Sequence, residues 1–132
     1  MLTSRRADAR QFGQESEQVA ERYLRRRGYT ILARNVRLPE GELDLVAKHG
    51  GVLVFVEVKA RRTPAMGGAL FAVNGRKRQR LIRVAAQYLA AHRVTDQPCR
   101  MDVVVIQHAP SGAVTVEQIE NAIELPSEDL RW

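Results

Sequence analysis

The stretch at residues 52–59, Val-Leu-Val-Phe-Val-Glu-Val-Lys, constrains the fold of this chain more than any other. Its apolar residues are mostly β-branched or aromatic and occupy both alternating sets of positions, which is typical of a strand covered on both faces inside an α/β sheet. Because side chains alternate along a strand, Glu57 and Lys59 share the face that begins with Leu53 and Phe55. A carboxylate and an ammonium group therefore end the strand on a face that starts hydrophobic.

Two interpretations of this charged strand end stay open from the strand alone. Charged groups on such a face are costly to desolvate unless they meet a partner, a metal ion or a solvent-filled cleft. Glu57 and Lys59 would then belong to a functional site. In the alternative interpretation, the strand end has reached the surface and the two residues form an ordinary ion pair.

The length and the charge of the chain limit its fold class and its partners. At 132 residues, it fits a single domain with a real core, which we place at residues 9–125 between a flexible basic N-terminus at residues 1–8 and a polar tail at residues 126–132. Lys and Arg number 21 against 15 Asp and Glu, a net charge of +6. This excess favours an anionic partner, most commonly nucleic acid, with general solubility as the alternative explanation.

Several classes of protein are disfavoured by what the chain lacks. The single cysteine, Cys99, excludes an intrachain disulfide and a cysteine cluster for zinc, and the three scattered histidines have no zinc spacing. There is no Gly-x-Ser-x-Gly elbow and no Walker-type loop, which argues against a serine hydrolase and an NTPase. No apolar run is long enough for a secretory signal or a membrane span, so we expect a cytoplasmic protein with no membrane partner.

Two segments have the periodicity of amphipathic helices. Residues 9–27 place an apolar stripe on one side, and Gly28 follows as a C-terminal stop. Glu17 stands at the border of that stripe, where an exposed glutamate is the usual case but a site role stays open. A second helix is predicted from an N-cap at Asn74 to about residue 92.

The remaining pattern predicts strands joined by turns. Strands are expected at residues 29–34, 42–48, 52–59, 101–107 and 113–116, with a turn at residues 35–41 and a short helical turn at residues 118–123. Alternation puts Leu43, Leu45 and Ala47 on one face of the second strand. Gly50-Gly51 joins that strand to residues 52–59 as an antiparallel hairpin. The whole reads as one α/β domain with a mixed sheet flanked by helices.

The hairpin brings two carboxylates together. Asp44 and Glu57 lie at similar distances on either side of the glycine turn, so they meet at its open end. Mg²⁺ prefers oxygen ligands, takes only one or two carboxylates and completes its shell with water and substrate phosphate. Such an ion can polarise a phosphodiester and lower the pKa of attacking water, while Lys59 orients or deprotonates that water or balances phosphate charge. Glu17 could add a further carboxylate from the first helix.

Basic residues gather after this hairpin. Their positions are Arg61, Arg62, Arg76, Lys77, Arg78 and Arg80. Those at the start of the second predicted helix oppose the helix dipole, which indicates an anionic partner, although a solvated basic face is the other interpretation. We therefore consider all six as candidate nucleic-acid-binding residues.

The motifs around these residues resemble a known family. They follow one another as Gly13-x-x-x-Glu17-x-x-Ala20-x-x-Tyr23-Leu24, Gly28-Tyr29, Arg34-Asn35-x-Arg37, Gly41-Glu42-Leu43-Asp44-Leu45, Phe55-Val56-Glu57-Val58-Lys59-x-Arg61, Lys77 and Arg100-Met101-Asp102-Val103-Val104. Together they resemble the bacterial YraN family of uncharacterised proteins over nearly the whole chain. That family is similar in fold and motif to restriction-endonuclease-like nucleases, whose signature is Asp…(Asp/Glu)-x-Lys, and to archaeal Holliday-junction resolvases.

The resemblance implies a restriction-endonuclease-like α/β fold with a nuclease active site. Glu17, Asp44, Glu57 and Lys59 match the catalytic positions of the motif. The resemblance also implies Mg²⁺ or Mn²⁺, held by Asp44, Glu57 and the carbonyl of Val58. Leu43 stands where the wider signature has a proline, in agreement with the YraN-type pattern.

Three functions compete at this point. The leading hypothesis is a metal-dependent endonuclease that hydrolyses phosphodiester bonds in structured or branched DNA. The second is a nucleic-acid-binding module that keeps the fold but does no chemistry, and the third is a subunit whose basic surface meets an acidic protein. A homodimer is expected by analogy, since related resolvases act on junctions with two-fold symmetry.

Overall fold

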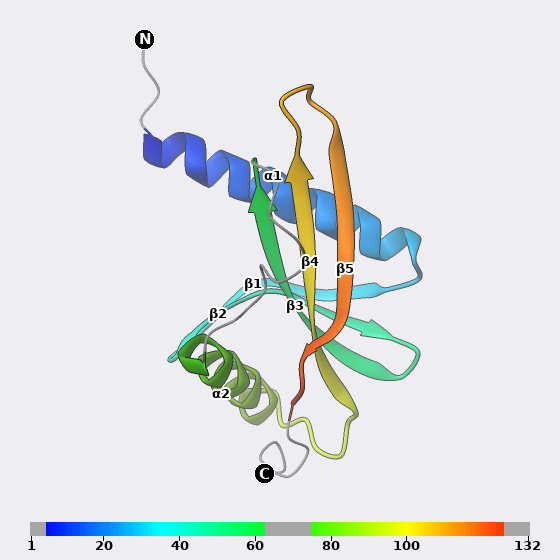
Figure 1. The fold of residues 1–132 in the computed structure, drawn as a ribbon. Coiled ribbons are helices and arrows are strands. Elements are labelled where there is room, and N and C mark those ends of the chain that lie inside the picture. Colours follow the sequence, from blue (N-terminus) through cyan, green and yellow to red (C-terminus); the bar gives the residue numbers. More distant parts are fainter. Residues whose placement is uncertain (1–4, 63–74, 126–132) are drawn as a thin grey trace.

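The computed structural model describes residues 5–62 and 75–125. The elements, in chain order, are α1 (Arg5–Arg26), β1 (Thr30–Leu38), β2 (Gly41–His49), β3 (Val52–Arg61), α2 (Gly75–Ala91), β4 (Cys99–His108) and β5 (Val114–Ile123) (Figure 1). Residues 63–74, with the predicted helix cap at Asn74, and the predicted tail at residues 126–132 lie outside the described residues.

The strands form one mixed sheet in the order β1-β2-β3-β4-β5. Neighbouring strands are antiparallel except β3 and β4, which are parallel and have α2 in the connection between them. Figure 1 shows α1 and α2 on opposite sides of this sheet. The predicted α/β fold, a mixed sheet flanked by helices, is confirmed. Neither described helix is long and apolar enough to cross a membrane.

Two hydrophobic layers hold the sheet between the helices. On the α1 side, Ala20 and Leu24 pack with Val54 and Val56 of β3. On the α2 side, Leu81 and its neighbours pack with the alternate β3 residues Leu53 and Phe55 and with residues of β4. The predicted burial of β3 on both faces is therefore confirmed, and its alternation carries Glu57 and Lys59 to the α2 side.

The predicted turn at residues 35–41 is wrong for most of its length. β1 continues through it to Leu38, and only Pro39 and Glu40 separate it from β2. The strand passes through Asn35 with a positive φ of 50°. Asparagine tolerates this left-handed conformation better than other residues with a Cβ, so the chain bends locally without leaving the sheet.

β2 does not alternate regularly between its two faces. Asn35 stands opposite Asp44, between the pairs Arg34–Leu45 and Val36–Leu43. Leu43 packs with the α2 layer, whereas Leu45 packs with the α1 layer. The prediction that Leu43, Leu45 and Ala47 share one face is therefore wrong for Leu43, because the alternation assumes a regular strand.

Two further boundaries differ from the sequence prediction. α1 begins at Arg5, ahead of the predicted residue 9. Residues 118–123, predicted as a helical turn, continue β5, which pairs with β4 from His108–Val114 to Met101–Ile123. A break in register near Met101 and a positive φ at Asn121 interrupt the strand pattern there, which explains why its sequence does not read as a strand.

A buried aspartate stabilises this irregular part of β5. Asp102 is fully buried and accepts hydrogen bonds from Arg100 Nε at 3.0 Å and from the Asn121 backbone N–H at 2.9 Å, both on Oδ1. Its Oδ2 accepts from Gln118 Nε2 at 2.9 Å. The carboxylate thus pairs with a cation and satisfies a backbone donor at the irregular turn of the strand.

Removal of this carboxylate is expected to destabilise the fold strongly. Asp102→Ala leaves the Arg100 guanidinium without its buried partner, so we expect a loss of roughly 3 kcal/mol in the free energy of unfolding. The matched control is Glu120→Ala, since Glu120 lies 3.9 Å from Arg100 and its side chain is exposed; a change below about 0.5 kcal/mol is expected. Urea unfolding measures both, and equal small losses would contradict a supporting role of Asp102.

Candidate active site

The candidate site lies where β2 separates from β3. The paired residues of the two strands end at Leu45–Val56, while β3 continues beside β4 to Arg61. Beyond that point the Asp44 side chain replaces the missing backbone partner, because its Oδ2 accepts a hydrogen bond from the Val58 N–H at 2.8 Å. In Figure 1, the β1–β2 hairpin diverges from β3 on this side of the sheet. The gap between the strands therefore contains a carboxylate.

Glu57 faces two ammonium groups and has one oxygen to spare. Its Oε1 lies 2.9 Å from Lys59 Nζ and 3.1 Å from Lys77 Nζ, so β3 and α2 each contribute a cation. Its Oε2 is buried and has no hydrogen-bond partner among the described residues. A buried carboxylate oxygen without a partner is costly, so this atom calls for a donor or a cation.

A small cavity of about 50 Å³ connects the two carboxylates. It is lined by Glu42, Leu43, Asp44, Val56, Glu57, Leu81 and Met101. A space of this size holds a water molecule or a single ion. Within residues 5–62 and 75–125 no three His, Cys, Asp or Glu side chains form a group that could hold a metal ion. The oxygen donors that line this cavity come from Glu42, Asp44 and Glu57.

Two further carboxylates approach Asp44 from the α1 side. With its amide turned so that the nitrogen faces them, Asn35 donates to Glu17 Oε2 and to Glu42 Oε1, each at 3.1 Å. Burial raises the pKa of Glu17, and the negative charges of Asp44 and Glu42 raise it further. This electrostatic coupling places Glu17 and Glu42 in the same acidic cluster as Asp44.

Asp44 is the most perturbed acid of the site. Burial raises its pKa to about 6, against the opposing effect of the Val58 N–H, and the charges of Glu57 and Glu42 add to the increase. A carboxylate that gains a proton so close to neutrality changes its charge easily. Perturbed acids of this kind gather in functional sites.

The two lysines have opposite shifts. Burial lowers the pKa of Lys77, and the neighbouring Lys59 lowers it further. For Lys59 the effect of burial is outweighed by the negative charges of Glu57 and Asp44, which raise its pKa. Lys59 is therefore held as a cation at the end of β3.

The structure brings together most of the residues that the sequence proposed. Asp44, Glu57 and Lys59 meet at the strand gap, and Glu17 joins them across the sheet. Lys77, proposed as a nucleic-acid contact, also reaches into the site. Sequence reasoning missed Glu42, although its position two residues before Asp44 was a usable signal. It also missed Asn35, although the motif Arg34-Asn35-x-Arg37 contains it.

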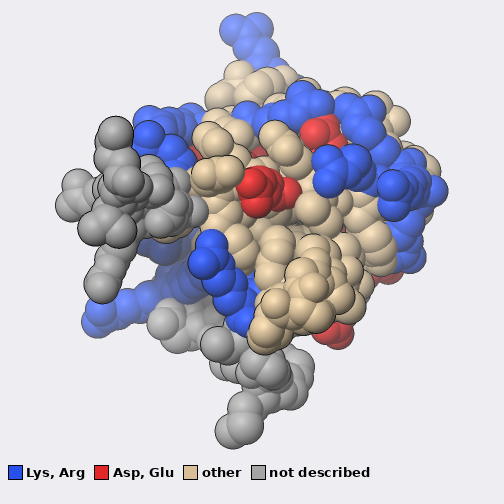
Figure 2. Space-filling view, turned by 90° about the horizontal axis from the view of Figure 1, so that it is seen from above, with Lys and Arg blue, Asp and Glu red and all other residues tan. Residues whose placement is uncertain are grey.

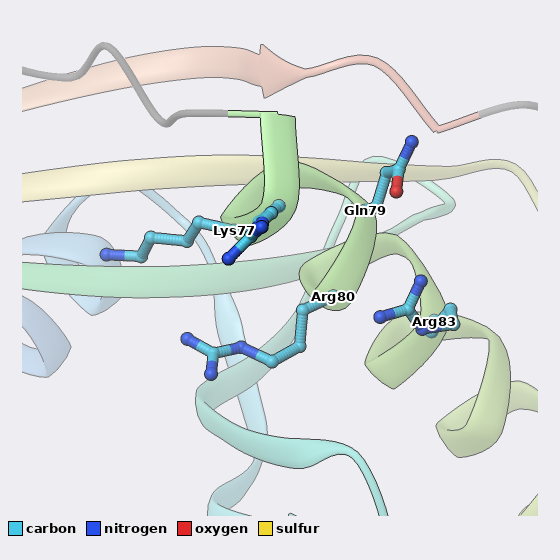
Figure 3. Close-up of a pocket in the computed structure, with 5 residues that line it drawn as sticks. Lys77, Gln79, Arg80 and Arg83 are labelled. Carbon is cyan, nitrogen blue, oxygen red and sulfur yellow. The ribbon is translucent and has the colours of Figure 1, made fainter.

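A basic groove lies next to the site on α2. It has a volume of about 430 Å³ and is lined by Arg76, Lys77, Gln79, Arg80 and Arg83, whereas Arg78 is not among its lining residues. Figure 3 shows Lys77 and Arg80 extending to the same side of the helix. Lys77 thus belongs both to the groove and to the Glu57 cluster.

The other proposed contacts lie at the end of β3. Arg61 ends the strand, and the Arg62 guanidinium stacks on the Phe12 ring of α1 at 4.2 Å from its centroid. In the view from above, Figure 2 shows a small acidic area in the middle of the face with Lys and Arg gathered towards the rim.

Comparison with known proteins identifies the family. Residues 16–106 match the uncharacterised protein family UPF0102. The chain belongs to this family. A UPF0102 protein of Symbiobacterium thermophilum is 46% identical over 86% of this chain and 97% of its own length. One from Geotalea uraniireducens is 38% identical over 95% and 98%. The family resemblance seen in the sequence motifs, to the YraN-like proteins, is thereby confirmed.

A distant likeness to a solved structure accompanies the UPF0102 match. The SfsA protein of Pyrococcus furiosus, solved in complex with Ca²⁺, aligns with 89% of this chain and 65% of its own, slightly under two thirds. The TM-score is 0.42 and the sequence identity 19%. Values this low do not carry a ligand or an activity from one protein to the other.

The raised pKa of Asp44 predicts how its replacement changes stability with pH. The folded-state pKa of Asp44, about 6, exceeds the ordinary value of 3.8, so ionisation of Asp44 destabilises the folded state. This destabilisation is absent below pH 4 and complete above pH 6. Asp44→Asn keeps an acceptor for Val58 and cannot ionise. In the presence of a chelator at pH 8, we expect its free energy of unfolding to be about 1 to 3 kcal/mol higher than that of the wild type.

That gain should shrink as the pH falls through 6 and be small at pH 4. Urea unfolding at pH 4, 6 and 8 measures it. Glu117→Gln, an acid-to-amide change at an exposed position of β5, is the control and should show little pH-dependent difference. A constant difference between Asp44→Asn and the wild type at all three pH values would contradict the raised pKa.

Proposed function

We propose that this UPF0102 protein is a metal-dependent endonuclease that hydrolyses phosphodiester bonds in structured or branched DNA. The observation that carries the proposal is the buried Glu57 Oε2, which lacks a partner among the described residues and shares a cavity with Asp44. The basic groove beside that cavity supports an anionic polymer as the substrate. A cytoplasmic location and a homodimer remain predictions that accompany this function.

The residues of the gap fit a hard divalent cation. Asp44 and Glu57, with the carbonyl oxygen of Val58, would hold Mg²⁺ or Mn²⁺. Such an ion supplies charge for the phosphate and lowers the pKa of bound water. The cavity of about 50 Å³ has room for one ion. A cation there would be a partner for Glu57 Oε2, which has none among the described residues.

Lys59 acts as a fixed positive charge in this proposal. Its Nζ lies 2.9 Å from Glu57 Oε1, and its raised pKa keeps it protonated at neutral pH. A protonated lysine can donate a hydrogen bond to the attacking water or to a phosphate oxygen, but it cannot accept a proton. Glu17, with its raised pKa, is the acid-base candidate on the opposite side of Asp44.

Cleavage assays test the proposal directly. Purified protein is incubated with four-way-junction, single-stranded and duplex DNA in the presence of Mg²⁺ or Mn²⁺. We expect cleavage of the branched substrate, and a loss of at least roughly 100-fold in Asp44→Asn and Glu57→Gln, because each removes a ligand charge from the same ion. Glu117→Gln, which changes an exposed carboxylate on β5, should cleave as the wild type does.

Two outcomes would count against this function. Cleavage that survives unchanged in Asp44→Asn and Glu57→Gln would come from another source. Salt-sensitive DNA binding without any cleavage or metal binding would favour the catalytically idle nucleic-acid-binding module. One observation supports that module: two lysines already neutralise Glu57 in the absence of a metal.

The basic groove gives a separate prediction about DNA affinity. The double variant Arg76→Gln/Arg80→Gln removes two cations that line it. We expect roughly tenfold or greater weakening of DNA binding and a salt dependence, log K against log salt, that is shallower by about 2. Fluorescence anisotropy across a salt series measures both quantities. Arg93→Gln, at an exposed position beyond α2, is the control and removes one charge. About half the effect of the double variant there would show that only net charge matters.

A further inference from the structure

Lys77 connects the carboxylate site to the basic groove. Its Nζ lies 3.1 Å from Glu57 Oε1, and the same side chain lines the groove with Arg76 and Arg80. Lys59 already contacts that oxygen at 2.9 Å. A single carboxylate oxygen thus faces two ammonium groups from two different elements, which is more positive charge than its own neutralisation requires.

The place of Lys77 in α2 is also unfavourable for the isolated helix. It stands in the first turn, which contains no acidic residue, and cations there oppose the helix dipole. Its side chain is 29% exposed, and that of Glu57 is 14% exposed. The contact with Glu57 offsets both costs, so Lys77 is held in the site by the negative charge of that carboxylate.

We propose that Lys77 is the counter-cation of Glu57 when no metal is bound. A divalent cation displaces the Lys77 ammonium group from Glu57, and Lys77 then binds a phosphate of the DNA strand in the groove. The inference rests on the proposed metal-dependent function. It assigns Lys77 a positioning role that couples occupation of the metal site to binding of the substrate.

Displacement follows from charge and reach. A divalent ion bound to Glu57 repels an ammonium group about 3 Å from the same carboxylate and removes the charge that attracts it. The lysine stem is flexible, and the groove that it already lines is where a backbone phosphate would meet Arg76 and Arg80. By linkage, metal and DNA must then strengthen each other's binding by the same factor.

Metal affinity without DNA is the first measurement. Calorimetric titration with Mn²⁺ compares the wild type, Lys77→Gln and Arg80→Gln. Arg80 is the matched control because it lines the same groove one helical turn further along and loses the same charge when replaced. We expect Lys77→Gln to bind Mn²⁺ on the order of tenfold more tightly than the wild type, and Arg80→Gln to change the affinity by less than about threefold.

DNA affinity with and without a cation is the second measurement. Anisotropy with junction DNA is recorded in chelator and in Ca²⁺, and a gel verifies that the DNA stays intact. In the wild type Ca²⁺ should strengthen DNA binding, whereas in Lys77→Gln most of that gain should be lost. Arg80→Gln should weaken binding in both conditions by a similar factor and keep the gain.

The outcomes separate this inference from the proposed function. If the wild type binds Mn²⁺ but Lys77→Gln tightens it no more than Arg80→Gln does, general electrostatics explains the effect and the inference is overturned. An undiminished Ca²⁺ gain in Lys77→Gln overturns it as well. If neither the wild type nor Lys77→Gln binds Mn²⁺, the proposed metal-dependent function fails together with the inference.

Discussion

The hydrogen bond between Asp44 Oδ2 and the Val58 N–H is the contact on which the site depends. A sheet that lets two strands separate must find new partners for the backbone groups it leaves, since buried donors without acceptors are costly. Here a side chain serves as that acceptor. The strands can therefore part at Leu45–Val56, and the gap exposes carboxylates from both sides of the sheet to one another.

The charges around this gap differ on its two sides. On the α2 side Lys59 and Lys77 share an oxygen of Glu57, and on the α1 side Asn35 holds Glu17 beside Glu42. Asp44 lies between the two groups, and burial raises its pKa. A proton, an ammonium group or a metal ion can each neutralise the carboxylates of such a site. This property is useful for binding a charged substrate.

Membership of the UPF0102 family and the proposed catalytic activity rest on different grounds. The match covers residues 16–106 and includes every residue of the candidate site, yet the family itself is described as uncharacterised. Support for nuclease chemistry therefore comes from the side chains and their contacts. Asp102, deeply buried and fully paired with Arg100 and Gln118, shows the contrast: its charge is satisfied within the fold, whereas Glu57 keeps one buried oxygen without a partner among the described residues.

The sequence by itself determined the helices, the central strand β3 and the neighbourhood of Asp44, Glu57 and Lys59, because amphipathic periods and a glycine turn are local properties of a chain. Only the tertiary structure decided what depends on irregular backbone or on long-range packing. β1 continues past the left-handed Asn35 through a predicted turn, and Leu43 packs on the opposite face of β2 from Leu45. The placement of α2 against the sheet brought Lys77 to Glu57. No local pattern encodes that contact, since it arises when two elements with no shared periodicity pack together.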